Sequence, residues 1–141
     1  MKNSHFDDSN HYFQLASDFV INTSTAVYLT GKAGTGKTTF LKYIRQHCEK
    51  NMVVVAPTGV AAINAGGVTL HSFFQLPFGP FVADAPSGFG INDQVVNKHR
   101  LLHNLKIGGN KRKLIQELEL LIIDEVSMLR CDMLDAMDHV L

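Results

Sequence analysis

One octapeptide near the start of the chain has the residue types needed to surround a chain of phosphates. Residues 31–38 read Gly-Lys-Ala-Gly-Thr-Gly-Lys-Thr and match the pattern G-x-x-x-x-G-K-[ST] at every specified position. Its glycines, Gly31, Gly34 and Gly36, allow backbone conformations in which successive N–H groups point inward at an anion. Lys37 adds a positive charge for the β- and γ-phosphates, and the Thr38 hydroxyl is a candidate ligand of Mg²⁺. The octapeptide therefore predicts a nucleotide-binding loop.

A second chemical element is the acidic pair Asp124 and Glu125, which follows the apolar run Leu-Leu-Ile-Ile. Ligands of open α/β sheets bind beyond the carboxyl ends of the strands, so the pair is expected at the same edge as the octapeptide. Asp124 is then placed to hold Mg²⁺, through water, and Glu125 to orient or deprotonate the water that attacks the γ-phosphate. Adjacent acids after an apolar run are a weak signal alone, and gain weight from the octapeptide.

The apolar pattern predicts alternating helices and strands around these two elements. A helix is expected over residues 8–21, with Tyr12, Phe13, Ala16, Phe19 and Val20 on one face. The octapeptide is predicted between a strand at 26–30 and a helix that runs to about Lys50, with Phe40, Leu41, Ile44 and Cys48 at helical spacing. Residues 52–56 and 120–124 are continuous apolar runs typical of strands buried on both faces. Three parallel strands with crossover helices follow from this pattern.

Composition and charge are those of an ordinary intracellular protein. The chain has 141 residues, 45% of them hydrophobic, and a formal net charge of zero. No apolar run reaches the roughly 20 residues that a membrane-spanning helix needs, and Cys48 and Cys131 are not in a C-x-x-C pair. We therefore expect a cytoplasmic protein, nuclear or mitochondrial if eukaryotic, with no membrane partner.

Two stretches between the last two predicted strands have an unusual composition. Residues 66–97 are rich in Gly and Pro and contain five of the nine phenylalanines: Phe73, Phe74, Phe78, Phe81 and Phe89. So long a loop is uncommon unless it is functional or disordered, and its rings either pack onto the core or contact a ligand or partner. Residues 98–113 contain six basic residues and no acid. That stretch is either a solvated surface or a surface for a polyanion.

Further segments resemble the Pif1-type superfamily 1 DNA helicases over about residues 13–134. The resemblance rests on Ala-Pro-Thr-Gly-Val-Ala-Ala-Ile-Asn-Ala-Gly-Gly-Val-Thr-Leu-His-Ser-Phe-Phe at 56–74 and on Asp-Glu-Val-Ser-Met at 124–128. RecD-type helicases share a shorter form of the first segment. The resemblance implies an α/β fold of the P-loop NTPase (RecA-like) type, with three layers around a parallel sheet that is incomplete at the C-terminal end.

The resemblance also implies a function, an ATP-dependent 5′-to-3′ DNA helicase acting in DNA repair, recombination or telomere and genome maintenance. The implied cofactors are ATP and Mg²⁺, the implied partner is single-stranded DNA, and a monomer is expected. The alternatives are a truncated module that binds nucleotide or DNA without turnover, and another P-loop ATPase, which would leave residues 58–72 unexplained.

The residues implied for these roles form three groups. The catalytic candidates are Lys37, Asp124 and Glu125, with Thr38 and Asp124 holding the magnesium. The nucleotide-binding candidates are Gln14, Gly31, Ala33, Gly34, Thr35, Gly36, Lys37, Thr38 and Thr39. The DNA-binding candidates are Pro57, Thr58, Gly59, His71, Ser72 and Phe73.

Ordinary structural roles are open for several of these candidates. Gln14 could read the adenine edge, since an amide both donates and accepts, or be a surface residue. Thr58 could cap a helix as well as contact phosphate. Phe73 and Phe74 could stack on bases, although core packing is expected for at least one of them.

The family's motor is longer than this chain, which matches only its first part. The expected organisation is an N-terminal segment of the first motor domain over 1–141. It is divided into a helical region (1–24), the phosphate loop and first DNA motif (25–65), the Phe/Gly/Pro-rich and basic insertion (66–113), and the Asp-Glu strand with its following helix (114–141). In the family's sheet, the strand between the phosphate-loop strand and the Asp124 strand comes later in sequence. We therefore expect either a gapped sheet, with an unfilled place beside the Asp124 strand, or a piece of a longer natural protein. We also expect a chain that binds nucleotide but by itself hydrolyses it poorly and does not unwind DNA.

Overall fold

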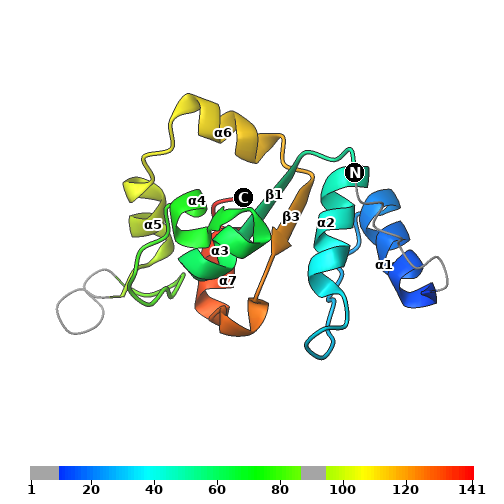
Figure 1. The fold of residues 1–141 in the computed structure, drawn as a ribbon. Coiled ribbons are helices and arrows are strands. Elements are labelled where there is room, and N and C mark those ends of the chain that lie inside the picture. Colours follow the sequence, from blue (N-terminus) through cyan, green and yellow to red (C-terminus); the bar gives the residue numbers. More distant parts are fainter. Residues whose placement is uncertain (1–9, 87–94) are drawn as a thin grey trace. The chain divides into compact units, whose positions relative to one another are not determined.

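The chain divides into two compact units, and each is described by itself. The computed structural model describes residues 10–86 and 95–141. One unit is Met1–Lys50 and the other is Asn51–Leu141 (Figure 1). Within the described ranges, no helix has both the length and the apolar character needed to cross a bilayer. The predicted helix start near Asp8 and the ring of Phe89 lie outside the described residues.

The first unit is built on two helices joined by a long loop. Helix α1 is His11–Asn22, and the Asn10 side chain caps it by accepting a hydrogen bond of 3.1 Å from the N–H of Phe13. Helix α2 is Lys37–His47 and ends before the predicted Lys50. The Phe13 ring packs edge-on against Phe40 and Tyr43 of α2, with ring centroids 5.2 and 5.1 Å apart. These ring contacts hold α1 beside α2.

The predicted apolar face of α1 is only partly right. Phe13, Ala16 and Val20 are partly buried, but Tyr12 is 81% exposed and Phe19 is 41% exposed. The buried residue of the helix is Ser17, whose hydroxyl donates to the Phe13 carbonyl at 2.7 Å. Because the Ser17 hydroxyl is satisfied by a carbonyl of its own helix, the residue can be buried without an unpaired polar group. Hydrophobic periodicity does not reveal a polar residue in this position.

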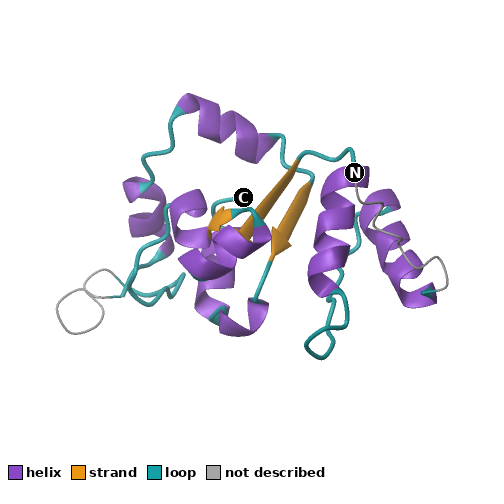
Figure 2. Cartoon of the chain, in the orientation of Figure 1, coloured by secondary structure: helices purple, strands orange, loops and turns teal. Residues whose placement is uncertain are grey.

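The predicted strand at residues 26–30 is wrong for this structure. These residues form loop in Figure 2, and the side chains of Val27, Tyr28 and Leu29 are 41%, 74% and 40% exposed. A strand exists only through hydrogen bonds to a neighbouring strand, and none of the described strands pairs with this segment. The segment has residue types that favour β-structure, but in the described part of the chain it has no neighbouring strand to pair with.

Three parallel strands form the sheet of the second unit, in the order β2-β1-β3. Strand β1 is Met52–Ala56 and β3 is Leu120–Ile123, which confirms two predicted strands, the second without its last residue. The short strand β2, Val68–Thr69, was not predicted. The register pairs Ala56 with Thr69, and Val55 with Ile123. The carboxyl ends of all three strands therefore meet at one edge.

Helices cover both faces of this sheet. Alternate strand residues point to opposite faces, and Val53 and Val55 belong to the main core cluster whereas Ala56 packs with Ala61 and Ala62. The last two are in α3, Gly59–Ala65. The main cluster draws on α4 (Leu70–Phe74), α5 (Lys98–Asn104), α6 (Gly109–Gln116) and α7 (Cys131–Asp138). The unit is thus a three-layer α/β arrangement, as expected.

Two adjacent glycines return the chain from α3 to β2. Gly66 ends the helix in the left-handed region with φ 66°. Gly67 donates its N–H to the Ala62 carbonyl at 2.8 Å, and a Cβ built on it would lie 2.2 Å from the carbonyl oxygen of Val54. Only a residue without a side chain can pass this close to β1. The glycine pair of the motif therefore has a packing role.

The Phe-rich segment is more ordered than the predicted long loop, since residues 68–74 form β2 and α4. Phe73, Phe74 and Phe81 are 7%, 0% and 3% exposed and join the main core. Packing onto the core is confirmed for these three rings. Phe78, at 91% exposed, is the exception.

Candidate functional site

The octapeptide adopts the backbone that its glycines permit. Gly34 and Gly36 have positive φ angles of 79° and 93°, a region glycine enters at no steric cost. Gly31 is required for a different reason, because a Cβ there would lie 2.6 Å from Oγ1 of Thr35. That hydroxyl donates to the carbonyl of Lys32 at 2.8 Å and tightens the turn. Each glycine of the predicted loop therefore has a geometric role.

Lys37 closes the loop from the first turn of α2. Its ammonium group donates to the carbonyl oxygens of Gly31 at 2.7 Å and of Lys32 at 3.0 Å. The helix starts at Lys37, directly after Gly36, so its unpaired N–H groups and the positive end of its dipole face the loop. The first turn of α2 contains no acidic residue. The arrangement is suited to an anion with several oxygens, such as a phosphate.

The other predicted nucleotide ligands lie around this loop or on the neighbouring helix. Ala33 is in the turn of the loop, and Thr38 and Thr39 are exposed in the first turn of α2. Gln14 is exposed on α1, next to Phe13, whose ring packs on α2. The helix that carries Gln14 is therefore fastened to the helix that starts at the loop.

The remaining predicted residues gather at the carboxyl edge of the second unit's sheet. Thr58 follows β1, His71 follows β2 and Asp124 follows β3. The N–H of Asp124 donates to the carbonyl of Val55 at 2.9 Å, which continues the ladder one residue past β3. Because the strands are parallel and in register here, the three segments leave the sheet side by side. One edge thus carries both the DNA-contact candidates and the acidic pair.

The acidic pair has a constrained backbone. A carboxylate oxygen of Asp124, Oδ1, accepts a hydrogen bond of 3.0 Å from the N–H of Glu125. Glu125 is exposed and has φ 52°, a left-handed conformation that is uncommon for a residue with a side chain. It turns the chain from β3 into the short 3₁₀ helix η2, Val126–Met128. Such strain tends to be retained where it aims a functional group.

The donor chemistry of the pair fits a hard cation. No cluster of three or more metal-ligating side chains occurs in residues 10–86 and 95–141. Mg²⁺ is commonly held by one or two carboxylates, with water and substrate phosphate completing its shell. Asp124, partly buried at a strand end, and the exposed Thr38 hydroxyl are oxygen donors of the right kind.

The first DNA-contact candidates form the start of α3. Thr58 caps this helix, as predicted, with its hydroxyl oxygen accepting from the N–H of Ala61 at 3.2 Å. Gly59 is exposed, and a Cβ built on it would meet no atom within 4 Å. Its backbone is therefore open to an approaching group from outside. Pro57, between β1 and the cap, is half-buried.

The second group of DNA-contact candidates is on α4. Thr69 caps the helix through a hydrogen bond of 3.3 Å from the N–H of Ser72. Ser72 is exposed and His71 half-buried, whereas Phe73 is a core residue with the ammonium of Lys111 5.4 Å from its ring centroid. The ring of Phe73 is therefore engaged in core packing rather than exposed to solvent.

Three hydrogen bonds at this site could not be predicted from the sequence. Gln75, in the left-handed region with φ 54°, donates to the carbonyl of Lys106 at 3.2 Å and accepts from its N–H at 2.9 Å. Lys111 donates to the carbonyl of Ser72 at 2.6 Å, and burial lowers the pKa of its ammonium group. These contacts join residues more than thirty positions apart, so no local pattern predicts them. They fasten the basic stretch to the helix of His71 and Ser72.

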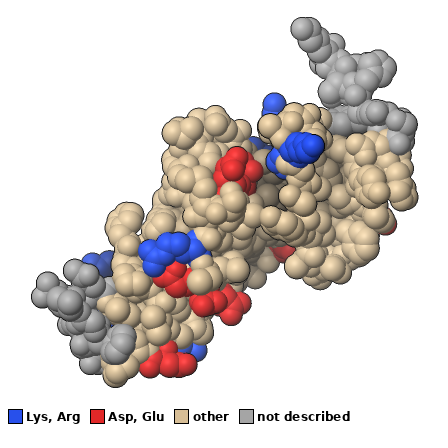
Figure 3. Space-filling model, turned by 90° about the horizontal axis from the view of Figure 1, so that it is seen from below, with Lys and Arg blue, Asp and Glu red and all other residues tan. Residues whose placement is uncertain are grey.

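The basic stretch itself forms α5 and α6. Lys98, Lys106, Arg112 and Lys113 are exposed, and Lys113 makes an ion pair of 3.7 Å with Glu117 one turn later. On the face drawn in Figure 3, Lys and Arg atoms occur near Asp and Glu atoms among many uncharged ones. For the basic stretch itself, the exposure of these four side chains is compatible with both interpretations, a solvated surface and a surface for a polyanion.

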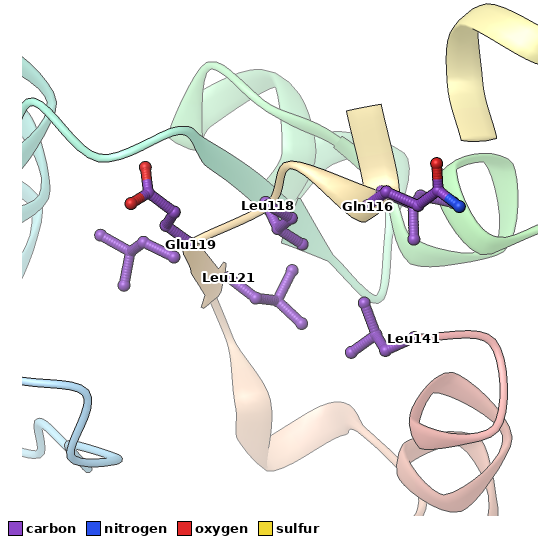
Figure 4. Close-up of a pocket in the computed structure, with 7 residues that line it drawn as sticks. Gln116, Leu118, Glu119, Leu121 and Leu141 are labelled. Carbon is purple, nitrogen blue, oxygen red and sulfur yellow. The ribbon is translucent and has the colours of Figure 1, made fainter. Parts of the chain in front are cut away.

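One cavity of the second unit lies away from this edge. It has a volume of about 510 Å³ and is lined by residues around the start of β3 and by Leu141. Figure 4 shows Leu118, Leu121 and Leu141 around it. All four residues of β3 are only half-buried, and among the described strands β3 pairs with β1 alone. Among the described strands, β3 is therefore an edge strand of the sheet.

Comparison with known proteins covers nearly the whole chain. The family model described as PIF1-like helicase matches residues 7–141. The ATP-dependent DNA helicase PIF7 of Trypanosoma brucei brucei (strain 927/4 GUTat10.1) is 35% identical over 133 residues, which are 93% of this chain and 12% of that protein. The ATP-dependent DNA helicase Pif1 of Psychrobacter sp. (strain PRwf-1) is 35% identical over 125 residues, which are 86% of this chain and 17% of that protein. The chain therefore spans less than a fifth of these relatives.

Solved structures give the same result at the level of the fold. Bacteroides sp Pif1 in complex with ADP-AlF4 has a TM-score of 0.72 and 43% identity, over 92% of this chain and 26% of that one. Bacteroides Pif1 bound to ssDNA has a TM-score of 0.73 and 45% identity, over 94% of this chain and 27% of that one. Together with the match of the family model from residue 7 to residue 141, these likenesses show that the chain belongs to the PIF1-like helicase family.

Proposed function

We propose that this chain is the nucleotide- and single-stranded-DNA-binding N-terminal segment of the first motor domain of an ATP-dependent 5′-to-3′ DNA helicase. The biological setting proposed with it is DNA repair, recombination or genome maintenance. Family membership supports this proposal. The observation that carries it is the phosphate loop, in which two left-handed glycines, a helix start and the Lys37 ammonium group converge.

Lys37 has the central role in nucleotide binding. Its ammonium group already lies against the loop carbonyls of Gly31 and Lys32, within reach of an anion cradled by the loop. An entering phosphate would exchange these neutral acceptors for charged ones, which make stronger hydrogen bonds. A related solved structure holds ADP-AlF4, which supports a nucleotide as the anion. Thr38 and Thr39 would add their hydroxyls, and Gln14 the adenine contact.

Asp124 and Glu125 divide the chemistry of hydrolysis between them. Magnesium, when bound, would neutralise charge that develops on the phosphate oxygens. Asp124, through water, and Thr38 would hold it there. Glu125 projects from a backbone fixed in the left-handed region, and its carboxylate would orient and deprotonate the attacking water.

Single-stranded DNA is the proposed partner of the carboxyl edge. Gly59 leaves its backbone open, and the Thr58 and Ser72 hydroxyls and the His71 ring are polar groups suited to phosphate oxygens. One related solved structure has ssDNA bound. The contacts of Gln75 and Lys111 give the basic stretch a fixed place beside this edge, where its charges would add salt-sensitive attraction.

The chain alone is proposed to bind nucleotide with poor turnover and without unwinding DNA. Two arginines already have partners in the second unit. Arg130 binds both carboxylate oxygens of Asp132, and Arg100 donates to the carbonyl of Val95 at 3.3 Å. Both guanidinium groups are therefore engaged in contacts within that unit. Robust DNA-stimulated ATP hydrolysis by the isolated chain would contradict this part of the proposal.

One titration tests the two binding functions together. Binding of fluorescent single-stranded DNA is measured across salt concentrations, with and without Mg-ATP, for the unaltered chain, for Lys37→Ala and for Lys42→Ala. Lys42 is the matched control, because it is exposed on the same helix and its loss removes the same charge away from the loop.

The expected result separates the nucleotide site from the DNA site. Lys37→Ala should weaken nucleotide binding about tenfold or more, as expected for losing a hydrogen bond to a charged group, and should abolish the effect of Mg-ATP on DNA. DNA binding itself should persist with its salt dependence unchanged. If Lys42→Ala weakens nucleotide binding as much as Lys37→Ala does, or if Lys37→Ala does not weaken it, the phosphate loop is not the nucleotide-binding site.

A further inference from the structure

The most exposed large apolar side chain of the described residues belongs to Phe78, at 91%. The Phe78 ring stacks on the ring of His71, with centroids 5.2 Å apart and planes at 12°. The other described rings of this segment, Phe73, Phe74 and Phe81, are buried. A parallel stack with so little of Phe78 covered leaves the outer face of its ring open.

The backbone on both sides of Phe78 is anchored, so the exposure of its ring is imposed by the fold. On one side, Leu76 is 5% exposed and its N–H donates to the His71 carbonyl at 3.2 Å. On the other, Phe81 is 3% exposed and its N–H donates to Asp132 at 2.9 Å. Pro77 and Pro80 restrict the backbone between these anchors. Phe78 is thus displayed by a short, pinned loop.

The surroundings of the stack are suited to a polyanion that carries flat rings. His71 lies on α4 at the carboxyl edge, next to the exposed Ser72. The Lys111 ammonium group donates to the Ser72 carbonyl, and the Gln75 side chain accepts from the backbone N–H of Lys106, whose side chain is exposed. A nucleic acid strand offers phosphates to such cations and bases to an open aromatic face, and single-stranded DNA has its bases free to stack.

We propose that the Phe78 ring, backed by His71, is a stacking platform for a base of single-stranded DNA. This inference rests on the proposed function and adds to it the first contact with a base rather than with a phosphate. The platform would tolerate any base, since every base has a π-face. His71 would act twice, through its ring face on Phe78 and through its ring edge on the strand.

The first test compares DNA with and without bases. Affinity of the chain is measured for an oligothymidylate and for an abasic oligomer of equal length, with the unaltered chain and with Phe78→Ala. Phe78→Ala should weaken binding of the oligothymidylate about fivefold or more, and should leave binding of the abasic oligomer within about twofold. Tyr12→Ala is the matched control, an equally exposed aromatic on α1 at 81%, and should change neither affinity.

The second test reads the stacking directly. The chain contains no tryptophan, so Phe78→Trp introduces a single fluorophore at the platform. Its fluorescence should be quenched by the oligothymidylate and much less by the abasic oligomer at equal saturation. Because Phe78 buries so little surface, neither variant should alter the thermal unfolding of the chain.

The outcomes separate the platform from the function on which it rests. If the unaltered chain binds single-stranded DNA but Phe78→Ala weakens both oligomers alike, or neither, the platform is wrong and the proposed function stands. If the unaltered chain binds no single-stranded DNA, the proposed function and the platform both fail. Fluorescence of Phe78→Trp that depends on protein concentration without DNA would make the ring a self-association contact and overturn the platform.

Discussion

The ammonium group of Lys37 donates a hydrogen bond of 2.7 Å to the carbonyl oxygen of Gly31, six residues earlier. This bond draws the two ends of the phosphate loop together, so the shape of the loop depends on the backbone at both residues. Gly31 is also constrained from inside the loop, because the Thr35 side chain occupies the space that a Cβ on this residue would need. The loop can therefore be disturbed without removing the Lys37 ammonium group.

Gly31→Ala should weaken nucleotide binding through one identifiable clash. The new Cβ would lie 2.6 Å from Oγ1 of Thr35, and relief requires either this side chain to rotate away from its hydrogen bond to the Lys32 carbonyl or the loop to shift. We expect affinity for a non-hydrolysable ATP analogue to fall at least about tenfold, measured by calorimetry, since donors displaced by a few tenths of an ångström lose good hydrogen-bond geometry.

The double variant Gly31→Ala/Thr35→Ala is the control. Thr35→Ala removes the clashing oxygen, so the pair should bind the analogue more tightly than Gly31→Ala alone, a non-additive result typical of residues in contact. A double variant as weak as the sum of the two single changes would mean that the clash is not the cause.

Gly67→Ala should destabilise the second unit strongly. The Cβ would lie 2.2 Å from the Val54 carbonyl oxygen, a backbone atom that cannot move without distorting β1. We expect a loss of about 3 kcal/mol or more in the free energy of unfolding, or failure to fold, in the range of severe core changes. Gly109→Ala is the control, since a Cβ in this first turn of α6 meets no atom within 4 Å, and it should be neutral or stabilising by up to about 1 kcal/mol.

Local structure could be predicted from this sequence more completely than tertiary packing. The octapeptide, the Thr58 cap and strand β1 follow from residue type and spacing, because glycine, cap and apolar-run preferences act within a few residues. The strand predicted at 26–30 is wrong because a strand also needs a neighbouring segment to pair with, and the residues at 26–30 do not determine whether one is there. Strand β2 is only two residues long, too short for any period to be detected.

The candidate site shows the same division. The side chains proposed to supply charge and hydroxyl groups follow from motif and resemblance, whereas the contacts that hold them in place do not. Gln75 binds the backbone of Lys106, 31 positions later. Phe78 is exposed between the buried Leu76 and Phe81, in a segment whose other described phenylalanine rings are buried. The tertiary contacts of the neighbouring residues decide which phenylalanine of such a segment is exposed. The composition of the segment does not distinguish one phenylalanine from another.

Glu125→Gly should stabilise the fold while removing the proposed catalytic carboxylate. Glu125 has φ 52°, and a residue with a Cβ pays an energy in this region that glycine does not. We expect the free energy of unfolding to rise by about 0.5–1 kcal/mol in urea melts. Glu125→Ala removes the same carboxylate but keeps the Cβ, so it should not rise. Equal stability of the two variants would show that the left-handed backbone is not strained.

The Asp132 carboxylate links α7 to the loop that displays Phe78, and its contribution to stability should depend on pH. Burial alone would raise its pKa, but the hydrogen bond from the N–H of Phe81 and the hydrogen bonds and charge of Arg130 outweigh burial and lower the pKa below its ordinary value of 3.8. A carboxyl group with a lowered pKa stabilises the fold above its unfolded pKa, and this stabilisation is lost as the pH falls through the folded value.

Asp132→Asn should therefore lower the free energy of unfolding at pH 7, by about 1–2 kcal/mol for a charged hydrogen-bond acceptor with one exposed partner. The difference from the unaltered chain should shrink as the pH falls below 3.8, the ordinary value, where the carboxyl group of the unaltered chain also becomes protonated. Asp135→Asn, exposed one turn away on α7, is the control and should change stability by less than about 0.5 kcal/mol at either pH. A difference for Asp132→Asn that stays constant from pH 7 to pH 2.5 would mean that its charge does not hold the loop, since only an ionised carboxylate gives a contribution that acid removes.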